Sequence, residues 1–275
     1  MQQAAIRPSQ KFHYISADLK NPSEGERILS EATSWNDGQP PDIVWNCAGS
    51  GRPGLFTEIP IEVFRDQMDT NYMSSVYIAH AALRAWLAPP KSTMNPASPS
   101  SEPRHIIFTS SVLAFYPLIG YTPYTPAKAA LRTLSDTLSQ ELQLYSSHPT
   151  AIKTHCIFPS TIYTDALEVE KETKPAVTLK LEESDNGQMP DEVAIACVRG
   201  LERGEEMITT NGLIGYLMKV GMLGSSIRNG WGILDTMTGW LASVVLVFVR
   251  WDMDRTVKKW GKGGRAGAVQ KANEG

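Results

Sequence analysis

The sequence predicts an α/β fold in which a doubly wound parallel sheet carries helices on both faces. Short, mostly apolar runs alternate with longer amphipathic segments between residues 12 and 205. Such runs are typical of strands buried on both faces, and the segments between them are long enough for crossover helices. The chain then changes character, so we expect an α/β domain at 1–205 and a C-terminal apolar helical extension at 206–275.

The first half of the chain is expected to hold two strands and two helices. The β-rich run at 12–17 and the apolar run at 42–47 predict strands, and the second run stops at Gly49. Residues 22–35 have the pattern of a capped amphipathic helix. Residues 61–87 place apolar side chains four positions apart, which is the period of a helix.

The second half continues this alternation after a break. Residues 89–103 contain five prolines and five serines or threonines, which predicts a loop. Residues 105–109 and Ile152–Phe158 predict strands, and residues 126–145 predict a long helix between them. Residues 165–192 hold nine acidic residues and three lysines, which favours a solvated surface excursion over an acid–base site.

The composition excludes several classes of protein. A chain of 275 residues with 42 % hydrophobic residues can bury a core, so disorder is not its main state. A net charge of −3 gives no reason to expect nucleic-acid binding. The three cysteines, Cys47, Cys156 and Cys197, lack the spacing of a zinc site, so we expect no metal and a reducing compartment. The sequence also begins without the pattern of a secretory signal.

The C-terminal segment has the features of membrane association. Residues 236–249 are uncharged and mostly apolar, and residues 207–227 are apolar apart from Lys219, but neither run reaches the length of a spanning helix. Seven basic and three acidic residues follow, a balance of +4, with Trp251 and Trp260 among them. This pattern predicts an interfacial helix or a re-entrant pair on a membrane surface. A core helix or the interface of a homodimer is the alternative.

The motif YTPAK carries the first sign of catalysis. Tyr124 and Lys128 are four residues apart at the start of a predicted helix, so both side chains lie on one face. An ammonium beside a phenol lowers the pKa of the phenol toward working pH, as a general acid requires. Ser111 ends the strand thirteen residues earlier, where a hydroxyl can reach a bound carbonyl group. Ser110 and Tyr121 do not have the corresponding spacing.

Two further features point to the same edge of the sheet. Residues 46–49 (NCAG) end the preceding strand, and Gly49 allows a cofactor to approach the backbone closely. Asn71 lies in the middle of a predicted helix, an unfavourable place for asparagine unless its amide is used. The carboxyl ends of parallel strands form the ligand-binding edge in open α/β sheets. The sequence therefore predicts an active site there.

With these motifs the chain resembles the short-chain dehydrogenase/reductase family. The NNAG motif of the family stands here as NCAG, and its P-G-x-I-x-T motif matches residues 159–164 except for Ser160 in place of glycine. The resemblance implies a Rossmann-like fold. It also implies that four residues carry the reaction: Asn71, Ser111, Tyr124 and Lys128.

The resemblance further implies a nicotinamide cofactor, NADPH. The residues that would contact it are Asp18, Leu19, Asn46, Ala48, Gly49, Tyr124, Lys128, Pro159, Ile162 and Thr164. The TGxxxGIG loop that holds the cofactor diphosphate in the family has no counterpart in this sequence. Residues 12–19 match the third strand of the family, so we expect a fold that lacks the first βαβ part and binds NADPH weakly or not at all. A fragment or interaction module that binds no cofactor is the alternative.

The segments 170–175 (EKETKP) and 250–261 (RWDMDRTVKKWG) are similar to a branch of the family that acts on a sphingolipid precursor. This similarity implies NADPH-dependent reduction of the C3 ketone of 3-ketosphinganine, a long-chain keto-lipid. It also implies a place on the endoplasmic reticulum membrane, at its cytosolic face. Another hydrophobic ketone, such as a steroid or a fatty acyl substrate, is the alternative.

Overall fold

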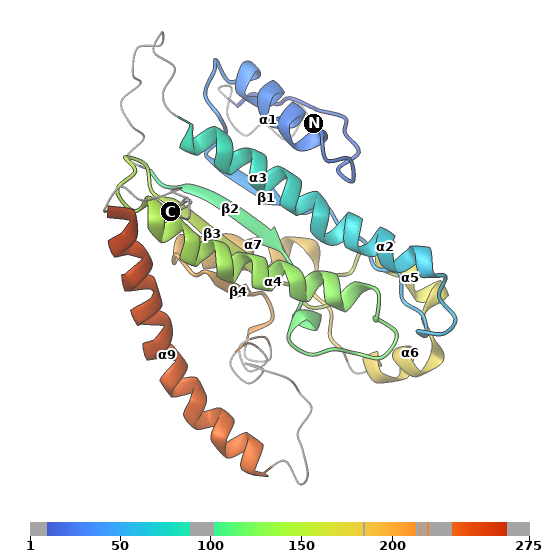
Figure 1. Cartoon of the computed structure of the whole chain (residues 1–275). Helices are drawn as coiled ribbons and strands as arrows, with labels where there is room; N and C mark the ends of the chain where they lie inside the picture. Colours follow the sequence, from blue (N-terminus) through green and yellow to red (C-terminus); the bar gives the residue numbers. More distant parts are fainter. Residues whose placement is uncertain are drawn as a thin grey trace, which may run out of the picture.

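Parallel strands form the centre of the computed structural model (Figure 1). Within the described residues the sheet has four strands in the order β1-β2-β3-β4. These are β1 (Ile43–Asn46), β2 (Arg104–Thr109), β3 (Ile152–Phe158) and β4 (Met207–Thr209). All three pairings are parallel. The structure describes residues 10–88, 102–183, 185–212, 215, 219 and 233–262.

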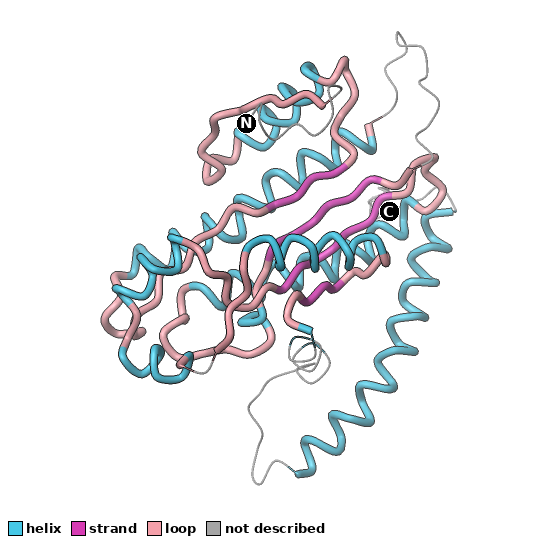
Figure 2. The backbone as a smooth tube through the Cα atoms, turned by 180° about the vertical axis from the view of Figure 1, so that it is seen from behind, coloured by secondary structure: helices cyan, strands magenta, loops and turns pink. Residues whose placement is uncertain are grey.

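The two central strands are buried on both faces, as their continuous apolar sequences predict. Ile106 and Phe108 of β2 pack into one core cluster with Leu131 of α4 (Tyr124–Glu141). Ile107 of the same strand packs into a second cluster with Val193 of α7 (Pro190–Glu202). Since neighbouring residues of a strand point to opposite faces, helices cover both sides of the sheet. Figures 1 and 2 show these layers from opposite directions.

The three predicted helices are present, but each of the two longer ones includes a turn of another helix type. The segment 22–35 contains α1 (Glu24–Trp35). The segment 61–87 is divided into α2 (Ile61–Met68), a π-helical turn η2 (Asp69–Met73) and α3 (Ser74–Leu87). The segment 126–145 forms α4, which begins at Tyr124, and ends in the short 3₁₀ helix η4 (Leu142–Tyr145). The predicted loop at 89–103 lies mostly outside the described residues.

The prediction of a strand at 12–17 is wrong. A strand needs a neighbouring strand for its backbone groups, and this segment contacts a helix instead. His13 Nε2 lies 2.9 Å from Glu31 of α1, and Arg27 of α1 donates to the Ser16 carbonyl at 2.7 Å. These contacts hold the segment along α1, away from the ladder of β1.

The acidic region 165–192 is also more ordered than its charge suggests. It contains α5 (Asp165–Thr173), α6 (Ala176–Glu182) and the start of α7. Thr178 of α6 is buried and donates a hydrogen bond to the Ile119 carbonyl at 3.0 Å. Gly120 next to it has a φ of +91°, and a side chain there would meet Thr178. The helices thus pack against the loop that precedes α4.

The C-terminal part contains one long helix, α9 (Ile233–Lys262), which includes the predicted apolar run 236–249. Among the described helices, none combines the length and apolar character needed to cross a membrane. Most of the run 207–227 lies outside the described residues, but its first three residues form β4. Because β4 pairs with β3, the sheet continues past the domain boundary expected at residue 205.

A glycine allows α1 to lie very close to α3. A Cβ atom at Gly25 would stand 2.5 Å from the Tyr77 carbonyl oxygen, a contact that backbone atoms cannot relieve easily. Gly25 is buried, and α1 contacts α3 along the helix pair. This close approach covers the outer side of α3.

We expect Gly25→Ala to lower the free energy of unfolding by about 1–3 kcal/mol, because the added methyl group forces the two helices apart. Urea unfolding followed by circular dichroism measures this. Gly239→Ala in α9 is the matched control, since a Cβ there meets nothing within 4 Å and alanine is the better helix former. Equal stability of the Gly25 variant and the parent would contradict the expected result.

Candidate active site

A cavity of about 470 Å³ opens at the carboxyl edge of the sheet. Residues that follow β1, β2 and β3 form its floor, and α4, α5 and α6 contribute its walls. Its lining includes Cys47, Gly49, Thr109, Ser111, Tyr121, Tyr124, Lys128, Pro159, Ile162, Thr164, Glu170, Lys174 and Glu182. The structure therefore places the main sequence motifs around one space.

Tyr124 and Lys128 lie one turn apart in α4, on the same face, as their spacing predicts. Lys128 Nζ is 5.4 Å from the centre of the Tyr124 ring. The lysine is only 4 % exposed, and its Nζ donates to the Thr109 carbonyl at the end of β2 at 2.9 Å. Both side chains line the cavity, so the phenol and the ammonium face the same space.

The two serines that follow β2 have different roles. The Ser111 hydroxyl contacts Tyr124 and accepts a hydrogen bond from the Leu113 amide at 3.2 Å. The Ser110 hydroxyl donates to the Lys128 carbonyl at 2.7 Å and so fastens α4 to the end of the strand. Of these two serines, the one chosen by spacing, Ser111, has its hydroxyl beside the tyrosine.

Asn71 lies in the π-helical turn η2 and is buried. Its amide nitrogen donates to the carbonyls of Ser50 and Gln67, each at 3.0 Å, and its Oδ1 accepts from the Ser50 amide at 3.0 Å. A π turn leaves helix carbonyl groups free for such bonds and frequently occurs at functional sites. Asn71 thereby fixes the loop after β1. A side chain at Gly49 would collide with Asn71 and crowd Lys128.

The pKa values differ from the expectation drawn from the spacing. Burial raises the pKa of Tyr124, the nearby Glu170 raises it further, and the contact with Ser111 opposes them. Burial lowers the pKa of Lys128 to about 8, partly opposed by Cys156 and Cys47. The predicted lowering of the tyrosine pKa is therefore wrong for this arrangement. The reason is that burial dominates, and Tyr124 stays protonated at neutral pH.

The residues predicted to contact a cofactor fall into two groups. Gly49, Pro159, Ile162 and Thr164 line the cavity together with Tyr124 and Lys128. The other four predicted residues lie outside its lining: Asp18, Leu19, Asn46 and Ala48. Ser160, which replaces a glycine of the resembled motif, lines the cavity and donates to Gln188 at 3.3 Å. Its backbone is not in the left-handed region, so the replacement causes no strain there.

A family model described as short chain dehydrogenase matches residues 1–175 of the chain. The chain belongs to this family. It is 45 % identical over 262 residues to 3-ketodihydrosphingosine reductase ksrA of Aspergillus fumigatus, spanning 92 % of this chain and 70 % of the relative. It is 42 % identical over 261 residues to 3-ketodihydrosphingosine reductase gsl-3 of Neurospora crassa, spanning 94 % and 70 %.

Solved structures agree on the fold of this short-chain dehydrogenase. A short chain dehydrogenase/reductase from Burkholderia phymatum in complex with NAD superimposes with a TM-score of 0.59 at 15 % identity. The superposition covers 74 % of this chain and 73 % of the other. Membership of the family means that the cofactor is a nicotinamide dinucleotide.

The cavity has the donor set that a nicotinamide riboside requires. The Lys128 ammonium has three hydrogens, of which the Thr109 carbonyl takes one, and Nζ borders the open cavity. Gly49 leaves its backbone uncovered beside the ammonium, where a larger residue would not fit. Lys128 and Tyr124 would hold the ribose hydroxyls, and Ile162 and Thr164 would border the nicotinamide ring. The residues present therefore fit the nicotinamide end of the group.

Four residues of the cavity wall were not predicted as site residues: Tyr121, Glu170, Lys174 and Glu182. The acidic composition of 165–192 favoured a solvated surface, but these side chains are partly or fully buried. The i, i+4 spacing of Glu170 and Lys174 was the available signal, since it places a carboxylate and an ammonium on one helix face.

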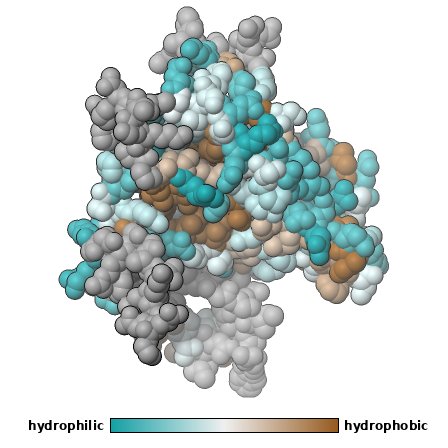
Figure 3. Space-filling model, turned by 45° about the horizontal axis from the view of Figure 1, so that its top comes forward, coloured by the Kyte–Doolittle hydropathy of each residue, from teal (hydrophilic) through white to brown (hydrophobic). Residues whose placement is uncertain are grey.

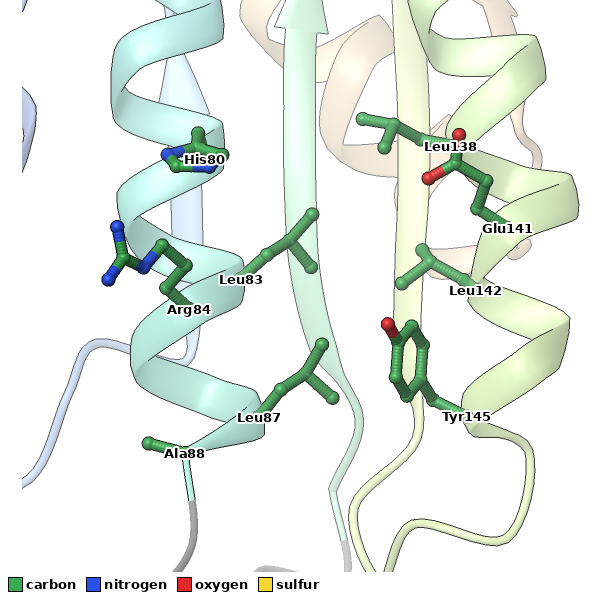
Figure 4. A pocket seen from close by; sticks show the side chains of 9 residues that line it. All are labelled: His80, Leu83, Arg84, Leu87, Ala88, Leu138, Glu141, Leu142 and Tyr145. Atoms are coloured by element: carbon green, nitrogen blue, oxygen red, sulfur yellow. The ribbon is translucent and has the colours of Figure 1, made fainter. Parts of the chain in front are cut away.

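A second hollow, of about 310 Å³, lies between the ends of α3 and α4. Leu83 and Leu87 of α3 point across it toward Leu142 and Tyr145 of η4 (Figure 4). Figure 3 shows that apolar side chains gather in a patch on the side of the molecule that carries α3 and α4. Helices of a parallel α/β fold run opposite to the strands, so this hollow lies at the amino edge of the sheet. It is separate from the catalytic cavity.

We expect Lys128→Met to raise the free energy of unfolding at pH 7 by about 1–3 kcal/mol, since a lowered lysine pKa means that folding disfavours its charge. The free-energy cost of burying the Lys128 ammonium is present in full below pH 8. This cost disappears as the pH rises from 8 to 10.5, because Lys128 loses its proton at a lower pH in the folded state than in the unfolded state. Urea unfolding at pH 7, 8.5 and 10 should show the advantage of methionine shrinking with pH.

Lys180→Met is the control for this experiment, since Lys180 is exposed in α6 and its replacement should change stability little at any pH. A Lys128→Met variant that is less stable than the parent at pH 7, or equally changed at all three pH values, would disprove the assignment of a buried charge.

Proposed function

We propose that this short-chain dehydrogenase reduces the C3 ketone of 3-ketosphinganine to the alcohol sphinganine, with NADPH as the reductant, in sphingolipid synthesis. The observation that carries the proposal is the group Ser111, Tyr124 and Lys128 around one cavity in a chain so similar to two 3-ketodihydrosphingosine reductases. A ketone reduction needs a proton donor, a carbonyl-orienting group and a place for the hydride donor, and this cavity has all three.

Each residue has a part that follows from its position. A bound nicotinamide supplies the hydride for the carbonyl carbon. The Ser111 hydroxyl hydrogen-bonds the ketone oxygen, and Tyr124 donates its phenolic proton to that oxygen as negative charge develops there. The Lys128 ammonium lies near the Tyr124 ring and stabilises the phenolate that remains. Asn71 holds the loop after β1 and so keeps the floor of the site in place.

NADPH is proposed over NADH because the direction of the reaction is reductive and biosynthetic. A comparison of kcat/KM for the two cofactors tests this choice. Formation of sphinganine from 3-ketosphinganine tests the substrate, and preferred reduction of a steroid or fatty acyl ketone would contradict it.

We also propose that α9 lies on the cytosolic face of the endoplasmic reticulum membrane. Among the described side chains of α9, the exposed apolar ones fall in a sector of about 160° at about 100° per residue, and such an apolar face can lie in a membrane interface. These side chains are Ile233, Met237, Trp240, Leu241, Val244, Val245, Val247, Phe248 and Trp251. Lys258, Lys259 and Lys262 follow on the same helix and suit an anionic lipid surface. A membrane position would bring the protein to the surface that contains a long-chain lipid substrate.

We expect Tyr124→Phe to reduce the rate of ketone reduction by about 10²- to 10⁴-fold, because it removes the proton donor. The affinity for NADPH, measured by cofactor fluorescence, should fall far less than the rate, because Lys128 still holds the ribose. Tyr145→Phe, in the second hollow, is the control and should keep the parental rate. Near-normal turnover of the Tyr124 variant would show that another group is the acid.

We expect the chain to float with phosphatidylcholine vesicles that contain phosphatidylserine. The double variant Trp240→Glu, Phe248→Glu should stay at the bottom of the gradient, because it places two carboxylates on the apolar face of α9. Ala242→Glu, which is exposed outside that sector, should still float. A parent that does not float, or an Ala242 variant equally impaired, would refute the membrane proposal. Protease access to a C-terminal tag in intact microsomes tests the side of the membrane.

A further inference from the structure

Four side chains form one hydrogen-bonded cluster in the wall of the catalytic cavity: Tyr121, Glu170, Lys174 and Glu182. The Tyr121 hydroxyl lies 2.8 Å from Glu170 Oε1 and 2.9 Å from Glu182 Oε1. Lys174 Nζ lies 3.1 Å from Glu170 Oε1 and 2.7 Å from Glu182 Oε2. We call this group the Glu170–Glu182 cluster.

The cluster has more hydrogen-bond acceptors than its own donor groups can satisfy. The phenol of Tyr121 has a single hydrogen, but two carboxylates approach its oxygen. Two carboxylates and one ammonium also leave a net charge of −1. In a partly buried wall such an imbalance is costly, because the local dielectric constant is low. One additional cationic donor would complete both the hydrogen bonding and the charge.

The cluster presents its carboxylates to the cavity. The side chain of Lys174 is 3 % exposed, whereas those of Glu170 and Glu182 are 19 % and 21 % exposed. The ammonium is therefore enclosed, and the open part of the wall belongs to the carboxylates. A molecule that enters the cavity meets negative charge there.

The cluster is close to the reacting centre. The rings of Tyr121 and Tyr124 are 5.9 Å apart, and the charge of Glu170 acts on the hydroxyl of Tyr124. A carbonyl oxygen that accepts the Tyr124 proton thus lies near the carboxylates. In 3-ketosphinganine the carbon next to the ketone carries an ammonium group, so this cation lies only two bonds from the reacting carbon.

We propose that Glu170 and Glu182 form a subsite for the ammonium group of the substrate and select 2-amino ketones over plain long-chain ketones. The inference rests on the proposed function, because it assigns the amine of that substrate a partner. Charge-assisted hydrogen bonds to a carboxylate are among the strongest available to a ligand, and they fix its orientation. The subsite would hold the C3 ketone in place beside Ser111 and Tyr124.

The test compares 3-ketosphinganine with 1-hydroxyoctadecan-3-one, which is the same ketone without the amine. The full chain with NADPH should show a kcat/KM about 10- to 100-fold higher for the amino ketone, mainly through KM. The double variant Glu170→Gln, Glu182→Gln should reduce the two ketones with similar KM values. Glu172→Gln, on the exposed side of α5, should keep the parental preference.

The outcomes separate this inference from the proposed function. A parent that reduces both ketones equally well overturns the subsite and leaves ketone reduction standing. A parent that reduces neither ketone overturns the proposed function and the subsite with it. A double variant that keeps the preference also overturns the subsite. If circular dichroism shows that the double variant does not fold, the isosteric single variant Glu182→Gln provides the same comparison.

Discussion

The attachment of α4 to the end of β2 is the constraint on which the site depends. The Lys128 side chain donates to the Thr109 carbonyl, and the Lys128 backbone carbonyl accepts from Ser110. One residue is thus held at both ends by the same strand terminus. Tyr124 lies one turn before Lys128 in α4, and Ser111 directly follows Ser110. The attachment therefore sets the separation of Tyr124 and Ser111. The cost is a buried ammonium, a loss of stability accepted at a functional position.

The walls of the cavity are built by a different principle from its floor. The floor consists of strand ends and glycines, where the backbone itself is exposed. The walls from α5 and α6 combine apolar side chains such as Leu167 and Leu181 with carboxylates that are held together by Lys174 and Tyr121. Apolar packing would close such a space, whereas mutually attracting charges can line it and stay partly hydrated. The arrangement suits a ligand that is apolar along its length and charged at one end.

Most of the sheet and the catalytic face of α4 could be predicted from the sequence, because continuous apolar strands and a four-residue spacing are local signals. The segment 12–17 was mispredicted because β-propensity does not supply a partner strand. The tyrosine pKa was mispredicted because it depends on burial, which the spacing alone does not reveal. The Glu170–Glu182 cluster was missed for a similar reason, since Tyr121 joins the two carboxylates from a distant part of the sequence.

The π-helical turn between α2 and α3 makes this part of the chain intolerant of a change in length. Each residue removed from a helix turns everything that follows by about 100°. Ile78, Ala82 and Trp86 of α3 all face the core, and α2 is joined to them without a loop that could absorb a rotation. A one-residue deletion within Asp69–Met73 would therefore turn either the core face of α3 or Asn71 out of register. The length of this turn is thus fixed by the packing of α3 on one side and by Asn71 on the other.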